Sequence, residues 1–429
     1  MENCLGSEVD RVGPGFGSTP ADNTGVNSPR QSPHCLPWLA VLVLLAAGAP
    51  GLPRAGAGAA EANIIEAGDG GHRALWVVRD GLLSPRAIKR MVADAHRAGI
   101  TDLLVQVRGR GDAYYESDLV PPALPLRDAR RKYGEFDPLA QVIELAHEHG
   151  IRVHAWMNMY LVSSAAKIPP GHILTTHPEW AAVDVRGRPM GDIGRKELAR
   201  ELTEGVYLDA GNPRVVRHLT AVVSELVRRY PVDGVHLDYL RFPHLDVGYS
   251  ESMRAAFRNR HGIDPLELNG NRKGLLAERG EMGYAELIET WSRFKAAQVT
   301  ALVIEVRQEI RLTRPGVILS AAVKPDPEAA HLGYGQDWST WIREDRLDVV
   351  APMMYSTSTR VIREQIKEIA RTVPTGSVWA GIAVYNQSLD QAAAKIREVR
   401  RAGLGGVSIF SYNSLPGGGQ DLVRLSAIR

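Results

Sequence analysis

One carboxylate in the chain, that of Asp238, lies at a position where a side chain could take part in catalysis. Residues 232–238, VDGVHLD, read as a β-strand, whose period of two places Gly234, His236 and Asp238 on one face and Asp233 on the other. Asp238 is the last residue of this run, so its carboxylate would lie at the carboxyl end of the strand, where β/α barrels carry catalytic groups. We therefore interpret Asp238 as a catalytic carboxylate; a structural ion pair with Arg241 is the alternative reading.

Polar and aromatic residues also cluster at the ends of other predicted strands. Aromatic rings stack on the apolar faces of sugars, while amide, guanidinium and carboxylate groups bind hydroxyls in a fixed pattern. This combination predicts a carbohydrate substrate. The expected substrate-binding residues are Gln106, Arg108, His154, Trp156, Asn158, Arg241, Lys324, Tyr355, Tyr385, Asn386 and Tyr412.

Cleavage of a glycosidic bond normally needs two carboxyl groups, one as acid and one as nucleophile or base. Asp112 and Glu116, in the segment after the second predicted strand, are the candidates for the second group. Asp209 reads better as a residue that starts a helix, and Asp326 is flanked by prolines, so both rank lower. A substrate N-acetyl group could also replace the protein nucleophile, and this alternative stays open.

A metal-dependent hydrolase or deacetylase is the rival chemistry. His236 and Asp238 form an H-x-D pair on one strand face, and His154 could supply a third ligand. His236 lies deeper in the strand than Asp238, however, where a neutral buried histidine is more usual. We therefore expect neither a metal nor another cofactor.

The elements that must position these residues alternate along the chain. Eight short apolar runs, each followed by an amphipathic stretch, predict an α/β fold of the (β/α)8 TIM-barrel type. An open doubly wound sheet would carry a glycine-rich phosphate loop after an early strand, and the sequence has none. Long loops are expected after strand three (159–211) and strand four (239–283), the latter followed by a long helix over 284–313. The predicted strands are 74–78, 102–107, 152–158, 232–238, 316–323, 347–354, 378–384 and 405–410.

The N-terminal region differs in composition from the rest. Residues 1–35 are rich in Gly, Pro, Ser and Asn and predict a disordered segment. Residues 36–60 hold an apolar run, 36–52, followed by small residues, which is typical of a signal peptide or anchor. We expect a linker over 61–71, the barrel over 72–429, and an exported protein of the periplasm or cell envelope, with membrane attachment only through residues 36–52.

The amino-acid composition limits the classes of molecule that the protein is expected to bind. The 429 residues carry a formal net charge of +2, so no basic excess is available to neutralise nucleic-acid phosphates. The two cysteines, Cys4 and Cys35, precede the predicted barrel, which therefore has no thiol nucleophile and no cysteine metal site. The expected partner is a polysaccharide.

Several motifs resemble one family, the family 10-like glycosyl hydrolases of bacterial envelopes, over roughly residues 72–413. They are RALWVVRDGL, DLLVQVRGRGDAYYES, FDPLAQVIELAHEHGIRVHAWMN, DGVHLDYLRFP and LDVVAPMMYS. The resemblance implies a (β/α)8 barrel that hydrolyses cell-wall glycan, including peptidoglycan stripped of its stem peptides. By this similarity Asp238 matches the strand-four aspartate. Many members have a second acidic residue next to it; here Tyr239 takes that place and Arg241 follows, as in a D-Y-x-R-F-P subgroup.

The sequence thus predicts an exported glycoside hydrolase of cell-wall glycan or a related polysaccharide, with Asp238 as a principal catalytic carboxylate. A barrel that binds polysaccharide without cutting it is the alternative that the unassigned second carboxylate leaves open.

Overall fold

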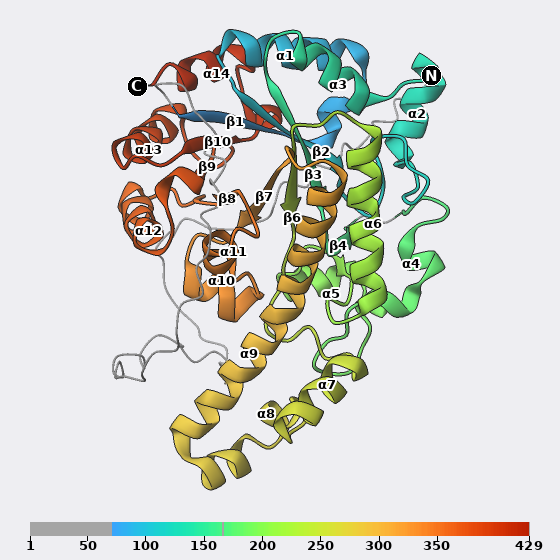
Figure 1. Ribbon diagram of the computed structural model, residues 1–429, viewed down its shortest axis with the longest axis vertical. Helices are drawn as coiled ribbons and strands as arrows, with labels where there is room; N and C mark the ends of the chain where they lie inside the picture. The colour runs from blue at the N-terminus through green and yellow to red at the C-terminus, as the bar shows by residue number, and fades with distance from the viewer. Residues whose placement is uncertain (1–70, 165–166, 429) are drawn as a thin grey trace, which may run out of the picture. The chain divides into compact units, whose positions relative to one another are not determined.

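Eight parallel strands form a barrel at the centre of the fold (Figure 1). The computed structural model describes residues 71–164 and 167–428. The barrel strands are β1 His72–Val77, β2 Asp102–Arg108, β3 Arg152–Asn158, β6 Gly234–Asp238, β7 Ile318–Val323, β8 Val349–Pro352, β9 Trp379–Ala383 and β10 Gly406–Phe410. Their order is β8-β7-β6-β3-β2-β1-β10-β9, and parallel bridges from Val350 to Val378 and from Met353 to Gly381 join the two edge strands. The predicted (β/α)8 barrel is confirmed.

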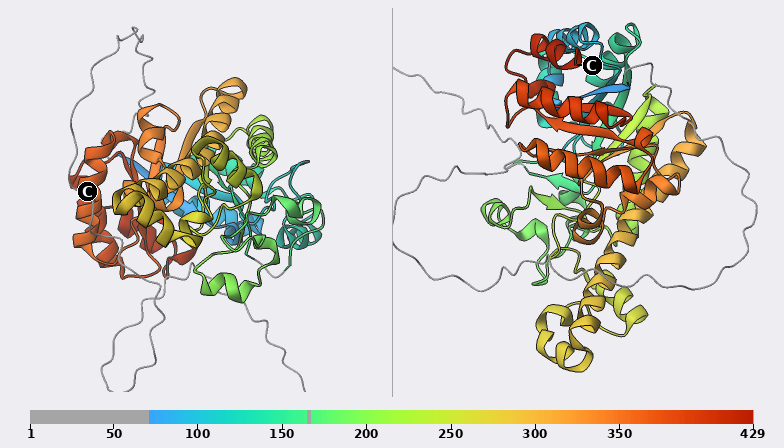
Figure 2. Two further views of the ribbon diagram at one scale, coloured as in Figure 1. Left: turned by 90° about the horizontal axis from the view of Figure 1, so that it is seen from below. Right: turned by 90° about the vertical axis from the view of Figure 1, so that its left-hand side faces the viewer.

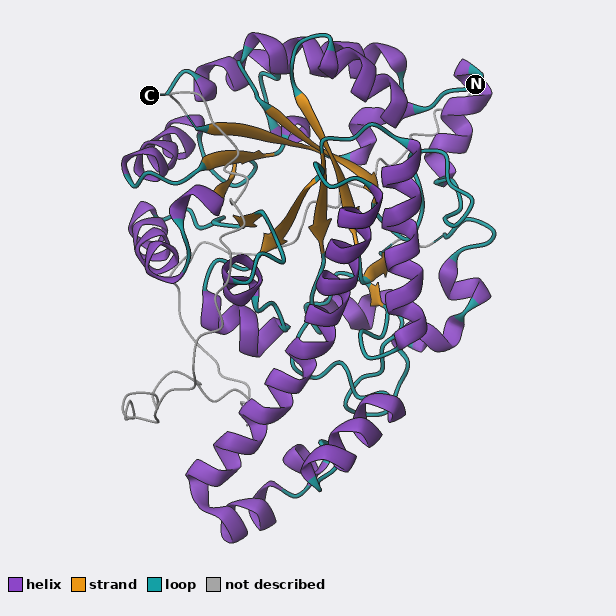
Figure 3. Ribbon diagram, in the orientation of Figure 1, coloured by secondary structure: helices purple, strands orange, loops and turns teal. Residues whose placement is uncertain are grey.

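Helices surround the strands (Figure 3). Ser84 and Asp137, each followed by proline, accept hydrogen bonds from backbone N–H groups of α1 and α3, which satisfies donors that have no partner inside a helix. The helices are α1 Pro85–Arg97, α2 Leu124–Tyr133, α3 Pro138–His147, α4 Ile173–Thr176, α5 Arg195–Arg200, α6 Pro213–Arg229, α7 Glu251–His261, α8 Glu267–Gly270, α9 Arg272–Thr313, α10 Pro327–Tyr334, α11 Trp338–Arg343, α12 Thr359–Thr372, α13 Leu389–Arg401 and α14 Gly419–Ser426. Short 3-10 helices lie at Arg79–Leu82, Pro178–Trp180, Met190–Asp192, Thr375–Ser377 and Tyr412–Ser414.

Long connections follow β3 and β6, as predicted. The first contains α4, α5 and a small antiparallel sheet of β4 (Leu161–Ser163) and β5 (Val206–Tyr207). After β6, the helices α7 and α8 and the start of α9 form a helical lobe that projects beyond the barrel (Figures 1 and 2). Helix α9 begins before the predicted position 284, because two helices meet at Gly280, whose φ of 71° is accessible to glycine.

The N-terminal segments predicted within residues 1–70 lie outside the described residues. Among the helices of residues 71–164 and 167–428, none is long and apolar enough to cross a membrane.

Candidate active site

Asp238 ends β6 at the carboxyl-end face of the barrel and is 8% exposed. Trp156 of β3 donates from Nε1 to Asp238 Oδ2 at 3.0 Å, and the backbone N–H of Tyr239 donates to Oδ1 at 2.6 Å. Burial raises the pKa of Asp238 to about 6, although these two donors and Arg241 oppose the shift. A carboxyl group with a pKa in this range can hold a proton and release it near neutral pH, as a general acid must.

A second carboxylate, which the sequence analysis missed, lies within electrostatic reach of Asp238. Glu204 precedes β5, and its Oε1 accepts a hydrogen bond from Arg241 Nη2 at 2.6 Å while Oε2 accepts one from the Tyr207 hydroxyl at 2.9 Å. Burial raises the pKa of Glu204, but the charge and hydrogen bond of Arg241, together with hydrogen bonds from the Glu204 backbone and from Tyr207, lower it below its usual value. Glu204 in turn helps to raise the pKa of Asp238. Their surroundings therefore move the two pKa values apart, so that Asp238 keeps its proton up to a higher pH than Glu204 does.

The connection that carries Glu204 is anchored on both sides. A Cβ at Gly205 would lie 1.8 Å from the carbonyl oxygen of Ser163 in β4, so only glycine permits this close approach. On the other side, the Thr203 hydroxyl and His244 Nε2 lie at hydrogen-bond distance, 3.0 Å, which ties the connection to the segment after β6. These contacts hold Glu204 at the barrel rim.

Two cations flank the carboxylates. Arg241 is 5% exposed, and its guanidinium lies 5.0 Å from the centre of the Tyr239 ring and 5.7 Å from that of Tyr334. Lys324 follows β7, with its Nζ 4.7 Å from the centre of the Tyr334 ring. Burial and the charge of Arg241 lower the pKa of Lys324 to about 8, while the charge of Glu204 opposes this. Both predicted binding residues therefore lie at the site.

An aromatic cluster lies beside the carboxylates. Its central ring is Phe410 of β10, which the sequence analysis did not select, and the surrounding ring centroids lie 5.4 to 6.2 Å away. Burial and the charge of Asp238 raise the pKa of Tyr355, which links the cluster electrostatically to that carboxylate. Within the described residues the buried Tyr385 hydroxyl has no hydrogen-bond partner. Exposed Asn386 donates to the carbonyl of Tyr355 at 2.9 Å. The rings around Phe410 are Trp76, Trp156, Tyr355 and Tyr385.

Three of the polar residues predicted to bind substrate form hydrogen bonds at the ends of β2 and β3. Asn158 is the register partner of Asp238, and it donates to the carbonyl of Gly109 at 2.7 Å. Gln106 donates to Asn158 at 3.4 Å and accepts a hydrogen bond from Arg79 Nη1 at 2.7 Å. Buried Arg108 donates to the carbonyl oxygens of Asn158 and of the residue that follows it. All three are buried, so the structure gives them a role in holding the strand ends beside Asp238.

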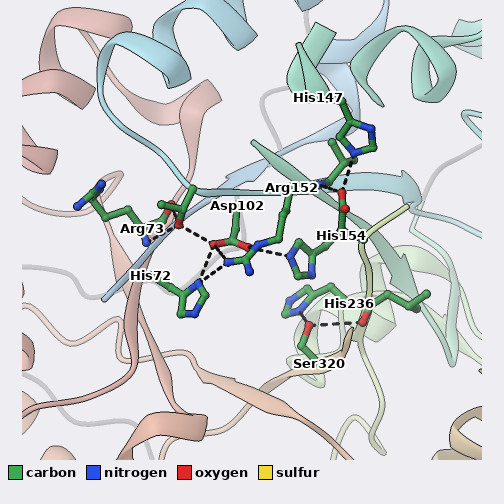
Figure 4. A network of polar contacts seen from close by, with 12 residues as sticks. His72, Arg73, Asp102, His147, Arg152, His154, His236 and Ser320 are labelled. Atoms are coloured by element: carbon green, nitrogen blue, oxygen red, sulfur yellow. Dashed lines mark hydrogen bonds and ion pairs between the residues drawn. The ribbon is translucent and has the colours of Figure 1, made fainter. Parts of the chain in front are cut away.

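His154 is not at the rim, which corrects its predicted position. Its ring is fully buried, and Nε2 lies 3.0 Å from Asp102 Oδ1 at the opposite end of the barrel (Figure 4). His72 and Arg152 bind the same carboxylate. Strand parity correctly predicts that His154 points inward, but His154 is only the third residue of β3, so it lies two layers below Asn158.

Tyr412 and Glu116 are also placed away from the carboxylate pair. The Tyr412 hydroxyl donates to Asp94 of α1 at 2.7 Å, so this side chain turns outward to the helix layer. Glu116 pairs with Arg130 of α2, its side chain is 58% exposed, and its backbone N–H lies 2.7 Å from the hydroxyl of Tyr230, which follows α6. Both residues lie beyond the regular strands, where alternation no longer fixes the direction of a side chain.

Asp112 is buried but turns back onto its own loop. Its Oδ1 accepts the backbone N–H of Arg110 at 3.0 Å, and it interacts electrostatically with Arg108, Arg110 and Tyr114. Asp209 accepts the N–H of Gly211 at 3.0 Å just before α6. Asp326 caps α10, as its bond from the Ala329 N–H at 2.8 Å shows.

His236 is a core residue. Its Nε2 accepts a hydrogen bond from Trp76 Nε1 at 3.2 Å, and its Nδ1 lies 2.9 Å from the Ser320 hydroxyl (Figure 4). Burial lowers its pKa to about 3, so the ring is neutral at ordinary pH. Both ring nitrogens are engaged, and within the described residues no group of three or more His, Cys, Asp or Glu side chains is arranged to hold a metal ion.

The fold and the site define a β/α barrel with a buried carboxyl group and an arginine-bound carboxylate at its carboxyl-end face. The sequence model of the glycosyl hydrolase-like 10 family matches residues 73–388, and the chain belongs to this family.

Curated relatives agree with this assignment. The chain is 28% identical over 313 residues to the glycosyl hydrolase DigH of Escherichia coli K12, covering 67% of this chain and 63% of DigH. It is 24% identical over 285 residues to the glycosyl hydrolase YngK of Bacillus subtilis 168, covering 62% of this chain and 48% of YngK. The chain therefore spans less than two thirds of the length of these relatives.

Two solved structures share the fold. The glycoside hydrolase domain of PgaB (BpsB) from Bordetella bronchiseptica aligns with a TM-score of 0.63 at 14% identity, covering 83% of this chain and 99% of that domain. The catalytic domain of a β-amylase from Paenibacillus polymyxa aligns with a TM-score of 0.56 at 13% identity, covering 84% and 99% respectively.

Proposed function

We propose that the protein is a glycoside hydrolase that cleaves a polysaccharide at the carboxyl-end face of the barrel. The observation that carries this proposal is the pair formed by Asp238 and Glu204, whose pKa values are shifted in opposite directions by their surroundings. Two carboxyl groups in opposite protonation states are what glycosidic bond cleavage requires.

In this mechanism Asp238 donates its proton to the glycosidic oxygen as the bond from that oxygen to the anomeric carbon breaks. Glu204, held ionised by Arg241, faces the developing positive charge on the sugar ring. It acts either as the nucleophile that attacks the anomeric carbon or as the base that takes a proton from the attacking water. Trp156 fixes the orientation of the Asp238 carboxyl, and the rings around Phe410 provide apolar surfaces for the sugars.

We further propose that the natural substrate is a bacterial cell-wall glycan and that the protein is exported to the cell envelope. The sequence resemblance to envelope glycosyl hydrolases and the apolar run at residues 36–52 support this part of the proposal.

The test is release of reducing ends from glycan strands that have been freed of peptide. We expect Asp238→Asn and Glu204→Gln each to lower kcat by roughly 10²–10⁴-fold, because each removes a proton-transfer or nucleophilic group. Glu116→Gln is the matched control and should retain activity, because Glu116 pairs with Arg130 among the outer helices. Full activity in Glu204→Gln would remove Glu204 from the mechanism.

The same strands also test the alternative of a barrel that binds without cutting. Retention of the wild-type protein on the glycan, with no reducing ends formed over a long incubation, would favour that alternative.

A further inference from the structure

Two arginines at the carboxyl-end face of the barrel, Arg79 and Arg110, take no part in the proposed mechanism. Arg79 begins the short 3-10 helix that follows β1, and Arg110 comes shortly after the end of β2, which pairs with β1. Only β3 lies between β2 and β6, the strand that ends at Asp238, and neighbouring strands are about 5 Å apart. The two arginines therefore lie on the same rim as the proposed acid.

The two arginines are neighbours in space across Gly109. A Cβ added to Gly109, the residue before Arg110, would be 2.9 Å from Cδ and 3.0 Å from Nη1 of Arg79, so the Arg79 side chain lies directly over this glycine. The Arg79 Nη1 donates to Gln106 Oε1 at 2.7 Å. The Arg110 Nε donates to the Ser164 hydroxyl at 2.8 Å. Both guanidinium groups are thus held in place by neutral partners.

The positive charge of this pair is only partly offset. Within residues 71–164 and 167–428, no aspartate or glutamate forms an ion pair with either guanidinium. Burial lowers the pKa of Arg110, and the nearby charge of Arg79 lowers it further. Asp112 and Asp80 oppose this shift from beyond ion-pair distance. Buried Arg108 also interacts with Asp112, so three positive charges share two carboxylates, an arrangement that a bound anion would stabilise.

The remaining N–H groups of the pair suit a carboxylate. Each guanidinium has one hydrogen bond to a side chain among the described residues, which leaves most of its N–H donors available, and both arginines are partly exposed. The planar fork of an arginine matches the two oxygens of a carboxylate, and such charge-assisted bonds are strong. The hydroxyls of a neutral sugar would accept hydrogen bonds but would leave the excess charge unchanged, whereas a carboxylate would satisfy both.

We infer that Arg79 and Arg110 form a subsite for a carboxylate carried by a sugar of the bound glycan, beside the position at which the chain is cleaved. The protein should therefore prefer acidic glycans, such as cell-wall strands that carry lactyl carboxylates. The inference rests on the proposed function for the entry of a glycan at this rim, but the preference for a carboxylate is a property of binding alone.

The experiment compares one polymer in two forms. Peptide-free glycan strands with intact lactyl carboxylates are measured beside the same strands after reduction of those carboxylates to alcohols. Binding is measured by calorimetry with the full chain carrying Asp238→Asn, which prevents cleavage during the titration. The quantity followed is the preference, defined as the Kd for reduced strands divided by the Kd for carboxylated strands. Arg79→Met and Arg110→Met are added singly, and Arg110→Lys retains the charge without the planar fork.

We expect the Asp238→Asn protein to prefer the carboxylated strands by roughly ten- to a hundredfold, as charge-assisted hydrogen bonds to one carboxylate would give. Arg79→Met and Arg110→Met should each lower this preference by roughly tenfold, mainly because the carboxylated strands bind more weakly. Arg110→Lys should keep part of the preference. Arg397→Met makes the same charge change on the exposed face of α13 and is the control, which should leave the preference unchanged.

Equal binding of the two polymers by the Asp238→Asn protein would overturn the inference. So would methionine variants that weaken binding of both polymers equally, because the arginines would then act only through the strand ends that Gln106 supports. A full preference in both methionine variants would also overturn it, since the carboxylate would then bind elsewhere. A preference for carboxylated strands without any cleavage by the wild-type chain would instead refute the proposed hydrolase while the subsite stands.

Discussion

The indole of Trp156 offers a direct test of Asp238 as the acid. In Trp156→Phe the ring volume is largely kept, but the Nε1–H bond to Asp238 Oδ2, 3.0 Å in length, is lost. This bond stabilises the ionised carboxylate, so its removal must raise the pKa of Asp238 further. A hydrogen bond to a charged group contributes about 1.5–3 kcal/mol, and one pKa unit corresponds to about 1.4 kcal/mol. The pKa should therefore rise from about 6 by roughly one to two units.

The assay is the pH dependence of kcat/KM on peptide-free glycan strands, with each profile normalised to its own maximum. The acid must be protonated to act, so activity falls as the pH rises through its pKa. We expect this basic limb to move to higher pH in Trp156→Phe. Trp379→Phe is the matched control, because Trp379 is equally buried and its Nε1 has no hydrogen-bond partner among the described residues. A limb that stays in place, or that moves to lower pH, would refute Asp238 as the group that titrates there.

Two further predictions concern the surroundings of the site. Gly205→Ala should lower kcat at least tenfold with little change in KM, because the added Cβ would collide with a carbonyl of β4 and displace Glu204. Unchanged kinetics would contradict this account of how the Glu204 carboxylate is held in position. Lys295 on α9 is 3% exposed, and burial lowers its pKa from 10.5 to about 7. Between these two pH values the folded state binds fewer protons than the unfolded state. The free energy of unfolding should therefore rise with pH across that range. Lys295→Met should therefore raise the thermal midpoint relative to the wild-type protein most at or below pH 7 and progressively less toward pH 10, and a gain independent of pH would exclude Lys295 as the titrating group.

The sequence was most informative where backbone periodicity controls the result. The alternation of apolar runs and capped helices predicted all eight barrel strands, and strand parity separated Asp238 from Asp233, which binds the N–H of Val153 and the ring of His147 at the other end of the barrel. Strand parity predicts which side chains point into the barrel, but it does not predict how far along the barrel axis each of them lies. His154 and Asn158 share one face of β3, yet the first belongs to the cluster around Asp102 and the second lies beside Asp238.

Glu204 shows why the second carboxylate could not be found by the same reasoning. It lies in the long connection after β3, where no period applies, and its position depends on the close approach of Gly205 to β4 and on a hydroxyl contact with the segment after β6. Both contacts are made between segments far apart in the chain. One signal was nevertheless available: Arg241 follows Asp238 closely, and a buried guanidinium requires an anionic partner. Since Asp238 needs to hold a proton in order to act as the acid, that partner had to be a different carboxylate, and a search for one in the long loops would have included Glu204.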